Sequence, residues 1–300
     1  KDDEVVVPAY AWSADVMAIL AVGATPVIAP VDERLGIDIS RLEECLSKRT
    51  RAIIAVHMRG VPCDIVGTIR IAKRHGVMVL EDGSQCFGGM IQDRPVGSHS
   101  DISVFSFQYN KLITGGEGGV LLCNDAEIAE RARPFHDQGM VREPDGADPE
   151  GEEAIFGFGL NYRLSELPAA MILAQLKKVS DILERLIEVR EMAVKELSGL
   201  IVQHDLVSRP IVPATVPNNA FLCLQAQNID ECLGFIEDLK NVGIPVSHCG
   251  HVDPHHFGAW TAFLERDGHN YRSLAGQESI DILDRTMFLE LNSMAKSSQN

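Results

Sequence analysis

Short, almost continuously apolar runs alternate with amphipathic stretches over the first part of the chain. The runs EVVVPAY, TPVIAPV, RAIIAVH and GVMVLED (4–10, 25–31, 51–57, 76–82) are rich in β-branched residues and have the length of buried strands. Between them, helical spacing predicts a helix capped by Ser13 and ended by Gly23, and two more at about 39–47 and 64–74. Apolar strands separated by amphipathic helices predict an α/β fold with a mainly parallel sheet covered on both faces.

The pattern changes in the second half of the chain. Met140–Ala154 is acidic, contains Pro and Gly and lacks periodicity, so we predict a mobile loop. One long amphipathic helix is predicted from Leu164 to about Leu197, with Pro168 in its first turn. Shorter pieces follow: a strand at 219–226, a helix at 229–243 and a strand at 244–248. We therefore predict a large α/β domain over residues 1–197 and a smaller α+β domain over 198–300.

Composition narrows the class of protein. The chain has 300 residues, of which 45% are hydrophobic, and no apolar run approaches the ~18 residues that a membrane helix needs. The formal net charge is −16 and the longest basic cluster is KRH at 73–75, which disfavours nucleic acid or an anionic membrane as a partner. Seven cysteines lie scattered in apolar segments without a C-x-x-C pair, and no signal peptide opens the chain. We expect buried, reduced thiols in a cytoplasmic protein.

Polar residues follow several of the predicted strands at their carboxyl ends, where ligands bind in parallel sheets. They are His57, Asp82 and the stretch Gln108–Lys111. If Asp82 and Lys111 converge, a buried carboxylate and an amine face one cavity. That arrangement suits a pyridine cofactor, with the carboxylate on the ring nitrogen and the lysine forming a Schiff base. The alternatives are a surface lysine and an acidic residue that only caps a turn.

The glycine-rich stretch TGGEGG (114–119) is not a nucleotide-binding loop. It lacks the G-x-x-x-x-G-K-[ST] pattern, and it precedes a strand where a dinucleotide site requires a helix. Its glycines instead permit positive φ angles and close approach of the backbone to a ligand.

Four motifs in one order resemble a known family. They are VVVPAYAWSADVMAILAVGATPVIAPVD, EDGSQCFGG, FSFQYNKLITGGEGGVLLCND and GLNYRLSELPAAMILAQL. The chain resembles the DegT/DnrJ/EryC1/StrS family of pyridoxal-phosphate-dependent aminotransferases, which act mostly on ketosugars. The resemblance covers residues 2–195 densely and the rest loosely. It implies the type I fold of these transferases: a large domain with a mainly parallel central sheet and a smaller C-terminal α+β domain.

The resemblance assigns roles to residues around the cofactor ring. Lys111 would form the covalent imine with pyridoxal phosphate, and Asp82 would pair with the pyridinium nitrogen. Gln85 would lie beside the ring hydroxyl. Trp12 matches the aromatic position that stacks on the ring; the alternative is an ordinary core aromatic residue.

Two further residues would bind the cofactor phosphate. Ser106, on the strand that leads to the lysine, would donate its hydroxyl, and Asn161 of NYR matches a residue that reaches the phosphate in the neighbouring subunit. The resemblance thus implies a homodimer with shared active sites. The alternatives are a simple strand hydroxyl for Ser106 and a helix cap for Asn161.

The implied reaction moves an amino group from glutamate or glutamine to a keto or aldehyde carbon of a sugar or sugar-nucleotide. Lys111 would be displaced by the donor and would then act as general base and acid. A dehydratase branch of the family carries histidine at this position, so Lys111 favours transamination. The pattern around it looks most like a subgroup that includes 8-amino-3,8-dideoxyoctulosonate aminotransferases.

The sequence also departs from the family. The chain starts at the family's second strand region, so we expect a leading segment with a phosphate-binding turn to be missing. Phe87 replaces the histidine of the family's Q-x-H-G motif. These departures leave an alternative, a non-catalytic homologue of regulatory or structural role that lacks the full phosphate site.

The segment SHCGHVDPHH (Ser247–His256) holds four histidines and one cysteine within ten residues. Its spacing is loose for metal ligation and no carboxylate completes a set at a helical offset, so we predict no metal site. The open alternatives are a polar loop, a contact with substrate, and a metal centre, which would make the chain a metal hydrolase.

Overall fold

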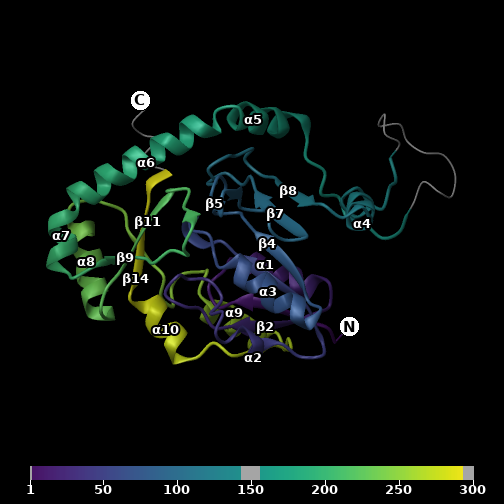
Figure 1. Cartoon of the computed structure of the whole chain (residues 1–300), viewed down its shortest axis with the longest axis horizontal. Coiled ribbons are helices and arrows are strands. Elements are labelled where there is room, and N and C mark those ends of the chain that lie inside the picture. Colours follow the sequence, from purple (N-terminus) through teal and green to yellow (C-terminus); the bar gives the residue numbers. More distant parts are fainter. Residues whose placement is uncertain (1, 143–155, 293–300) are drawn as a thin grey trace.

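The structure, a computed structural model, describes residues 2–142 and 156–292, and a seven-stranded sheet forms its centre (Figure 1). The strand order is β13–β2–β1–β3–β4–β7–β8, and all neighbouring pairs are parallel except β7 and β8. The mainly parallel sheet predicted from the sequence is confirmed. Its strands are β1 (Glu4–Pro8), β2 (Thr25–Ala29), β3 (Thr50–Val56), β4 (Met78–Asp82), β7 (Ile102–Ser106), β8 (Gly119–Cys123) and β13 (Arg272–Ser273).

Both faces of this sheet are covered, because successive side chains of each strand point to opposite sides. Val7 packs into one core cluster together with α1 (Ser13–Ala21) and α9 (Phe257–Arg266). Its neighbour Val6 packs into another, with α2 (Leu42–Cys45) and α3 (Ile65–His75). The helices therefore sandwich the sheet, as the apolar strands predict. Trp12 and not Ser13 occupies the N-cap of α1.

A second, antiparallel sheet lies beside the first, with strand order β12–β14–β11–β9. Apolar side chains of α8 and α6 pack on its central strands and form a separate core cluster. The segment 257–273 returns to the first sheet through α9 and β13, so the chain crosses between the sheets more than once after residue 198. The elements are β9 (Val207–Ser208), β11 (Phe221–Gln225), β12 (Ser247–His248), β14 (Thr286–Glu290), α7 (Ser198–Gln203), α8 (Ile229–Asn241) and α10 (Gln277–Asp284).

A small sheet joins residues from both halves of the chain. It pairs β5 (Met90–Ile91) with β6 (Arg94–Pro95) and with β10 (Thr215–Val216). The domain boundary expected at 197/198 stays a prediction.

The helix predicted over Leu164–Leu197 is wrong as a single element. The structure divides it into α5 (Glu166–Leu176) and α6 (Val179–Glu196), which arch over the molecule (Figure 1). The break arises because the N–H of Lys178 bonds the carbonyl of Gln175, three residues back, which tightens and ends the turn. Pro168 does lie in the first turn of α5, where it removes no helical hydrogen bond.

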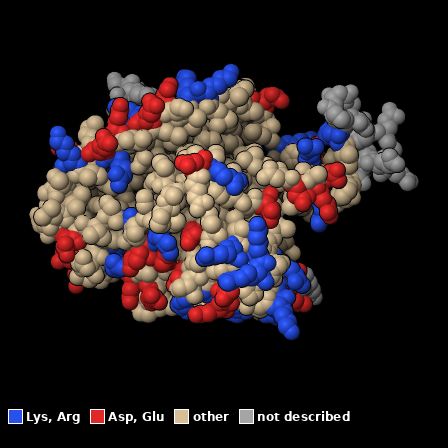
Figure 2. All heavy atoms as spheres, in the orientation of Figure 1, with Lys and Arg blue, Asp and Glu red and all other residues tan. Residues whose placement is uncertain are grey.

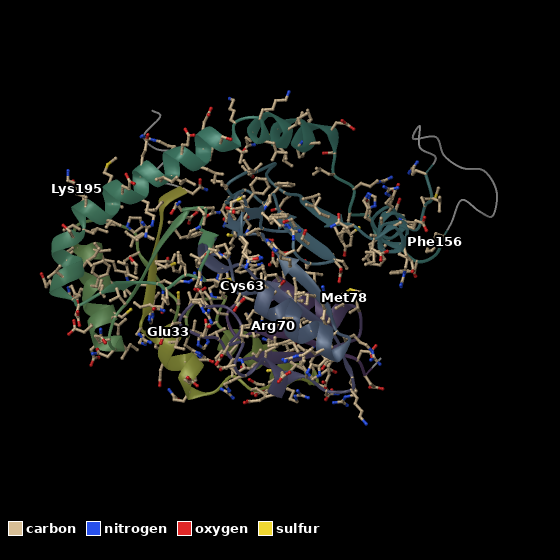
Figure 3. All side chains as sticks on the ribbon, viewed as in Figure 1. Glu33, Cys63, Arg70, Met78, Phe156 and Lys195 are labelled. Carbon is tan, nitrogen blue, oxygen red and sulfur yellow. The ribbon has the colours of Figure 1, made fainter. Side chains whose placement is uncertain are left out.

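The helix α4 (Ala126–His136) and the segment around Phe156 project away from the body (Figures 1 and 3). The loop predicted at Met140–Ala154 lies outside the described residues except for its first three positions. On the face seen in Figure 2, acidic and basic side chains are interspersed. Among the described residues, no helix combines the length and the apolar character that crossing a bilayer requires.

Candidate active site

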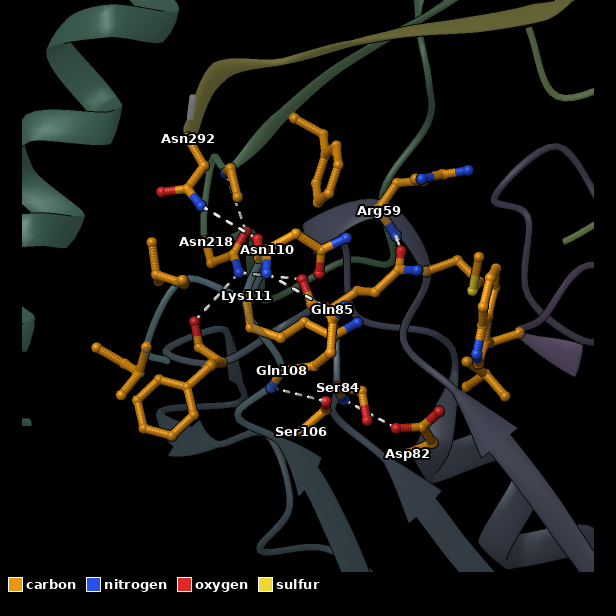
Figure 4. A pocket seen from close by; sticks show the side chains of 18 of the residues that line it. Arg59, Asp82, Ser84, Gln85, Ser106, Gln108, Asn110, Lys111, Asn218 and Asn292 are labelled. Atoms are coloured by element: carbon orange, nitrogen blue, oxygen red, sulfur yellow. Dashed lines mark hydrogen bonds between the residues drawn. The ribbon is translucent and has the colours of Figure 1, made fainter. Parts of the chain in front are cut away.

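A cavity of about 650 Å³ lies at the carboxyl ends of β3, β4 and β7, where a parallel sheet presents its ligands. Five of the six residues predicted for the cofactor site line it: Trp12, Asp82, Gln85, Ser106 and Lys111. Side chains of four of them gather around this space in Figure 4. The structure thus brings together residues from α1, β4, β7 and the turns that follow the strands.

Lys111 lies in the turn that joins β7 to the antiparallel strand β8. Its main-chain N–H bonds the carbonyl of Gln108, and the glycines that follow include Gly116 with φ +87°, a value that side chains disfavour. Burial is the main cause that lowers the pKa of Lys111 below its ordinary value. The carboxylate of Asp82 opposes this shift and the Arg59 guanidinium adds to it. The amine therefore gains nucleophilic character towards neutral pH.

Asp82 is the last residue of β4 and faces the cavity, and its neighbour Glu81 faces the opposite side of the sheet. Asp82 is 7% exposed, and its Oδ1 accepts the main-chain N–H of Ser84 at 2.8 Å. Glu81 instead accepts Nε2–H of His57 at 3.1 Å and the hydroxyl of Ser100 at 3.1 Å. Strand alternation thus places only one of the two adjacent carboxylates in the cavity.

His57 does not belong to the cavity, although it follows β3 in the way that the sequence analysis expected for a ligand-binding edge. The ring is fully buried, and its Nδ1 accepts the main-chain N–H of Cys63 at 3.0 Å. The proton consequently resides on Nε2 and is donated to Glu81. The pair is part of the structural interior beneath the site.

Gln85 lies at the centre of the cavity wall. Its Oε1 accepts the main-chain N–H of Arg59 at 2.9 Å, and its Nε2 lies 3.0 Å from Nε2 of His255 (Figure 4 draws the first of these bonds). Arg59 belongs to the 3₁₀ turn η1 (Met58–Gly60) and has φ +51°, an unusual value for a residue with a side chain. The backbone is thus held in a costly conformation beside Gln85.

Ser106 and Trp12 both line the cavity. The Oγ of Ser106 accepts the main-chain N–H of Gln108 at 3.3 Å, and its own proton is available to a ligand. Trp12 is 47% exposed and its ring lies 4.8 Å from that of His255, so the core alternative for this aromatic residue is wrong.

Asn161 does not reach the cavity of its own chain. It lies in the projecting segment, forms a β-bridge with Asp137, and is exposed. Its Oδ1 lies 3.3 Å from Nε of Arg163. No helix begins at Asn161, since α5 starts at Glu166, so it is not a helix cap.

Of the histidines in 247–256, His255 alone lines the cavity. His248 bonds the carbonyl of Asp284, and Nδ1 of His256 accepts the N–H of Gly258 at the start of α9. Within the described residues, no group of three or more His, Cys, Asp or Glu side chains is arranged to hold a metal ion.

Arg59 and Asp15 also line the cavity, although neither was predicted from the sequence. Asp15 lies in the first turn of α1, three residues after Trp12, and its Oδ2 is buried without a hydrogen-bond partner in the described structure. Burial and the nearby Asp82 raise its pKa well above the ordinary value. Asp15 could have been predicted from its helical spacing, three residues after Trp12. Arg59 could have been predicted from its position just after a strand.

Solved aminotransferase structures share this fold. The aminotransferase from Psychrobacter cryohalolentis superposes with a TM-score of 0.83, covering 99% of this chain and 80% of that one at 22% identity. Neighbours of this kind are pyridoxal-phosphate-dependent enzymes of fold type I, which confirms the predicted fold class.

Curated relatives are similar in sequence as well. GDP-perosamine synthase of Caulobacter vibrioides is 32% identical over 298 residues, which cover 93% of this chain and 76% of that protein. GDP-perosamine synthase of Escherichia coli O157:H7 is 35% identical over 205 residues, which cover 68% of this chain and only 54% of the relative.

The family model of the DegT/DnrJ/EryC1/StrS aminotransferases matches residues 1–257. The chain belongs to this family, as its motifs predict, and the aminotransferases of the family depend on pyridoxal phosphate.

The residues in the cavity fit this cofactor. A carboxylate and an amine of lowered pKa face the same space, a half-exposed indole borders it, a hydroxyl has its proton available, and one buried carboxyl oxygen has no partner in the described structure.

Proposed function

We propose that the chain is a pyridoxal-phosphate-dependent aminotransferase that moves an amino group from glutamate or glutamine to a keto or aldehyde carbon of a sugar or sugar-nucleotide. The observation that carries the proposal is the presence of Lys111 and the buried Asp82 in one cavity. When bound, the cofactor supplies an electron sink conjugated to the nitrogen that is transferred.

The residues of the chain divide the work of binding and proton transfer. Lys111 would hold the cofactor covalently through Nζ, and the same amine, once free, would act as general base and acid. Asp82 would keep the ring nitrogen protonated, and Gln85 would donate to the ring hydroxyl. Trp12 would cover one face of the ring, and Ser106 would bind the phosphate.

The substrate class rests on the relatives. Both curated relatives reported above are named GDP-perosamine synthase, which favours a nucleotide-linked sugar. An octulosonate-type sugar, indicated by the motif around Lys111, is the second candidate. A panel of keto-sugars with and without a nucleotide separates the two. We place the reaction in the cytoplasm, because all seven cysteines are unpaired and six of them are buried.

A spectroscopic titration tests the proposal. The wild-type protein mixed with pyridoxal phosphate is expected to develop the visible absorption of a lysine-bound cofactor, and glutamate or glutamine is expected to bleach it as the amine form accumulates. A keto-sugar that accepts the amino group is then expected to restore the band, which would demonstrate the second half-reaction. A protein that develops no band would favour the non-catalytic alternative.

We further propose a homodimer in which Asn161 of one copy reaches the cofactor phosphate of the other. Apolar side chains are exposed along β8, α4, the segment 156–164 and α5; Phe158 and Leu167 are each 80% exposed. The ring centroids of Phe135 and Phe158 lie 6.3 Å apart and those of Phe135 and Tyr162 lie 6.2 Å apart, so part of this surface is clustered, and a clustered apolar surface favours a protein contact. Asn161 lies within it, which favours a second copy of the chain as its partner.

The substitution Phe158→Asp is expected to shift the protein from dimer to monomer in size-exclusion chromatography with light scattering, because it buries a charge in the contact. Val202→Asp on α7 is the matched control. This apolar side chain is also 80% exposed, but it does not belong to the proposed dimer contact. A wild-type protein that is monomeric at micromolar concentration contradicts the proposed dimer.

A further inference from the structure

The carboxamide of Gln85 is held in one orientation by two contacts. The main-chain N–H of Arg59 is 2.9 Å from Oε1, and a main-chain N–H can only donate. Oε1 therefore faces Arg59, and the amide nitrogen faces His255 across 3.0 Å. A flipped carboxamide would place two donors against each other at Arg59.

This orientation fixes the protonation of His255. Because Nε2 of Gln85 donates, Nε2 of His255 has to accept, and the ring proton resides on Nδ1. Nδ1 is 2.7 Å from Oδ1 of Asp253, and the main-chain N–H of His255 donates to the same oxygen at 2.9 Å. Nη2 of Arg59 also lies 3.1 Å from Nδ1, but the carboxylate is closer and can only accept, so the Nδ1 proton is directed to Asp253. Burial lowers the pKa of His255, and the nearby Asp253 opposes that shift only in part. The ring is accordingly neutral near pH 7.

Asp253 is itself anchored on its other oxygen. Oδ2 accepts the hydroxyl of Tyr10 at 2.7 Å and the guanidinium of Arg59 at 2.8 Å. Burial alone would raise the pKa of Asp253, but the hydrogen bond from His255 and the charge of Arg59 hold it far below the ordinary value. The guanidinium also lies 3.6 Å from the ring centroid of Phe288, which fixes its position.

We propose that Asp253 and His255 form a positioning pair that holds the second N–H of the Gln85 carboxamide towards the ring hydroxyl of the cofactor. The pair acts through Gln85, and its proposed role rests on the proposed function. Without His255 only the bond from the N–H of Arg59 remains, so the carboxamide swings about that single contact and its donor is no longer held towards the cavity. The role of the segment 247–256 could not be decided from the sequence. In this proposal the segment acts on the cofactor through His255 and Gln85.

The consequence is a change in acidity at the nitrogen that joins Lys111 to the cofactor. A donor on the ring oxygen stabilises its negative charge and weakens the attraction of that oxygen for the proton on the nitrogen. Losing the donor therefore strengthens this attraction and raises the pKa of the nitrogen. The charged or titratable groups around Lys111 are Asp15 on α1, Arg59 on η1, Asp82 on β4, Tyr109 and Glu117 in the β7–β8 turn, Glu290 on β14, and His255 itself. Of these, His255→Ala removes only the imidazole, which is neutral near pH 7.

A pH titration of the visible absorption tests the pair. His255→Ala is expected to raise the apparent pKa of the cofactor band by roughly one unit. His251→Ala, an exposed histidine of the same loop, is the matched control and is expected to leave it unchanged. In a Gln85→Ala background, His255→Ala is expected to add no shift, because the two act in series. A shift of the same size in that background, or none in the wild-type background, overturns the proposal.

A second measurement needs no cofactor. Nitrogen-15 NMR of the labelled protein near pH 7 is expected to show His255 neutral with its proton on Nδ1. A proton on Nε2, or on both nitrogens, overturns the pair. Failure of the proposed function is distinguishable, because the wild-type protein would then form no band with pyridoxal phosphate whatever the tautomer of His255.

Discussion

Replacing Lys111 with alanine is expected to lower kcat/KM for amino transfer by about 10⁴-fold or more, because one side chain supplies both covalent attachment and proton transfer. Among the described residues that line the cavity, Lys111 is the one lysine, so no second amine is at hand to take over both tasks. Steady-state kinetics with glutamate or glutamine and a keto-sugar measure the loss.

Lys195→Ala is the control for this substitution, since Lys195 is exposed on α6 and points away from the body (Figure 3). Its activity is expected to match that of the wild-type protein. If Lys111→Ala retains activity within tenfold of the wild-type value, Lys111 is not the catalytic residue.

Asp82→Asn is expected to lower kcat by about 10²–10³-fold, the size of effect seen when one group that stabilises developing charge is removed. The amide cannot hold the ring nitrogen protonated, so the cofactor becomes a weaker electron sink. The amide oxygen still accepts the N–H of Ser84, which keeps the turn after β4 intact and separates chemistry from folding.

Asp267→Asn removes an exposed charge just after α9 and serves as the control, with no change in kcat expected. Equal activity of Asp82→Asn and wild-type protein would remove Asp82 from the cofactor site. An increase in KM with kcat unchanged would make Asp82 a substrate-binding residue instead.

The central sheet was predictable because its strands are apolar on both faces, a pattern that a short surface strand does not have. The position of Asp82 and Lys111 at one edge followed from the parallel topology and the family motifs. The break between α5 and α6 was not predictable, because the helical spacing of apolar residues is the same before and after Lys177 and Lys178. The turn itself depends on a single hydrogen bond between residues three positions apart.

The hydrogen-bond network around Gln85 could not be predicted from local sequence patterns. Its contact with His255 joins residues 170 positions apart, and only the return of the chain through α9 to the first sheet brings them together. The positive φ of Arg59 likewise reflects tertiary contacts and not a local preference, since arginine disfavours that conformation.

Hydride reduction of the protein loaded with pyridoxal phosphate, followed by mass mapping of its peptides, shows directly whether Lys111 carries the cofactor. Borohydride adds hydrogen across the carbon–nitrogen double bond and makes the link permanent. We expect one phosphopyridoxyl group, attached to Lys111. A label on another lysine, or an unlabelled Lys111 peptide after full loading, would contradict it.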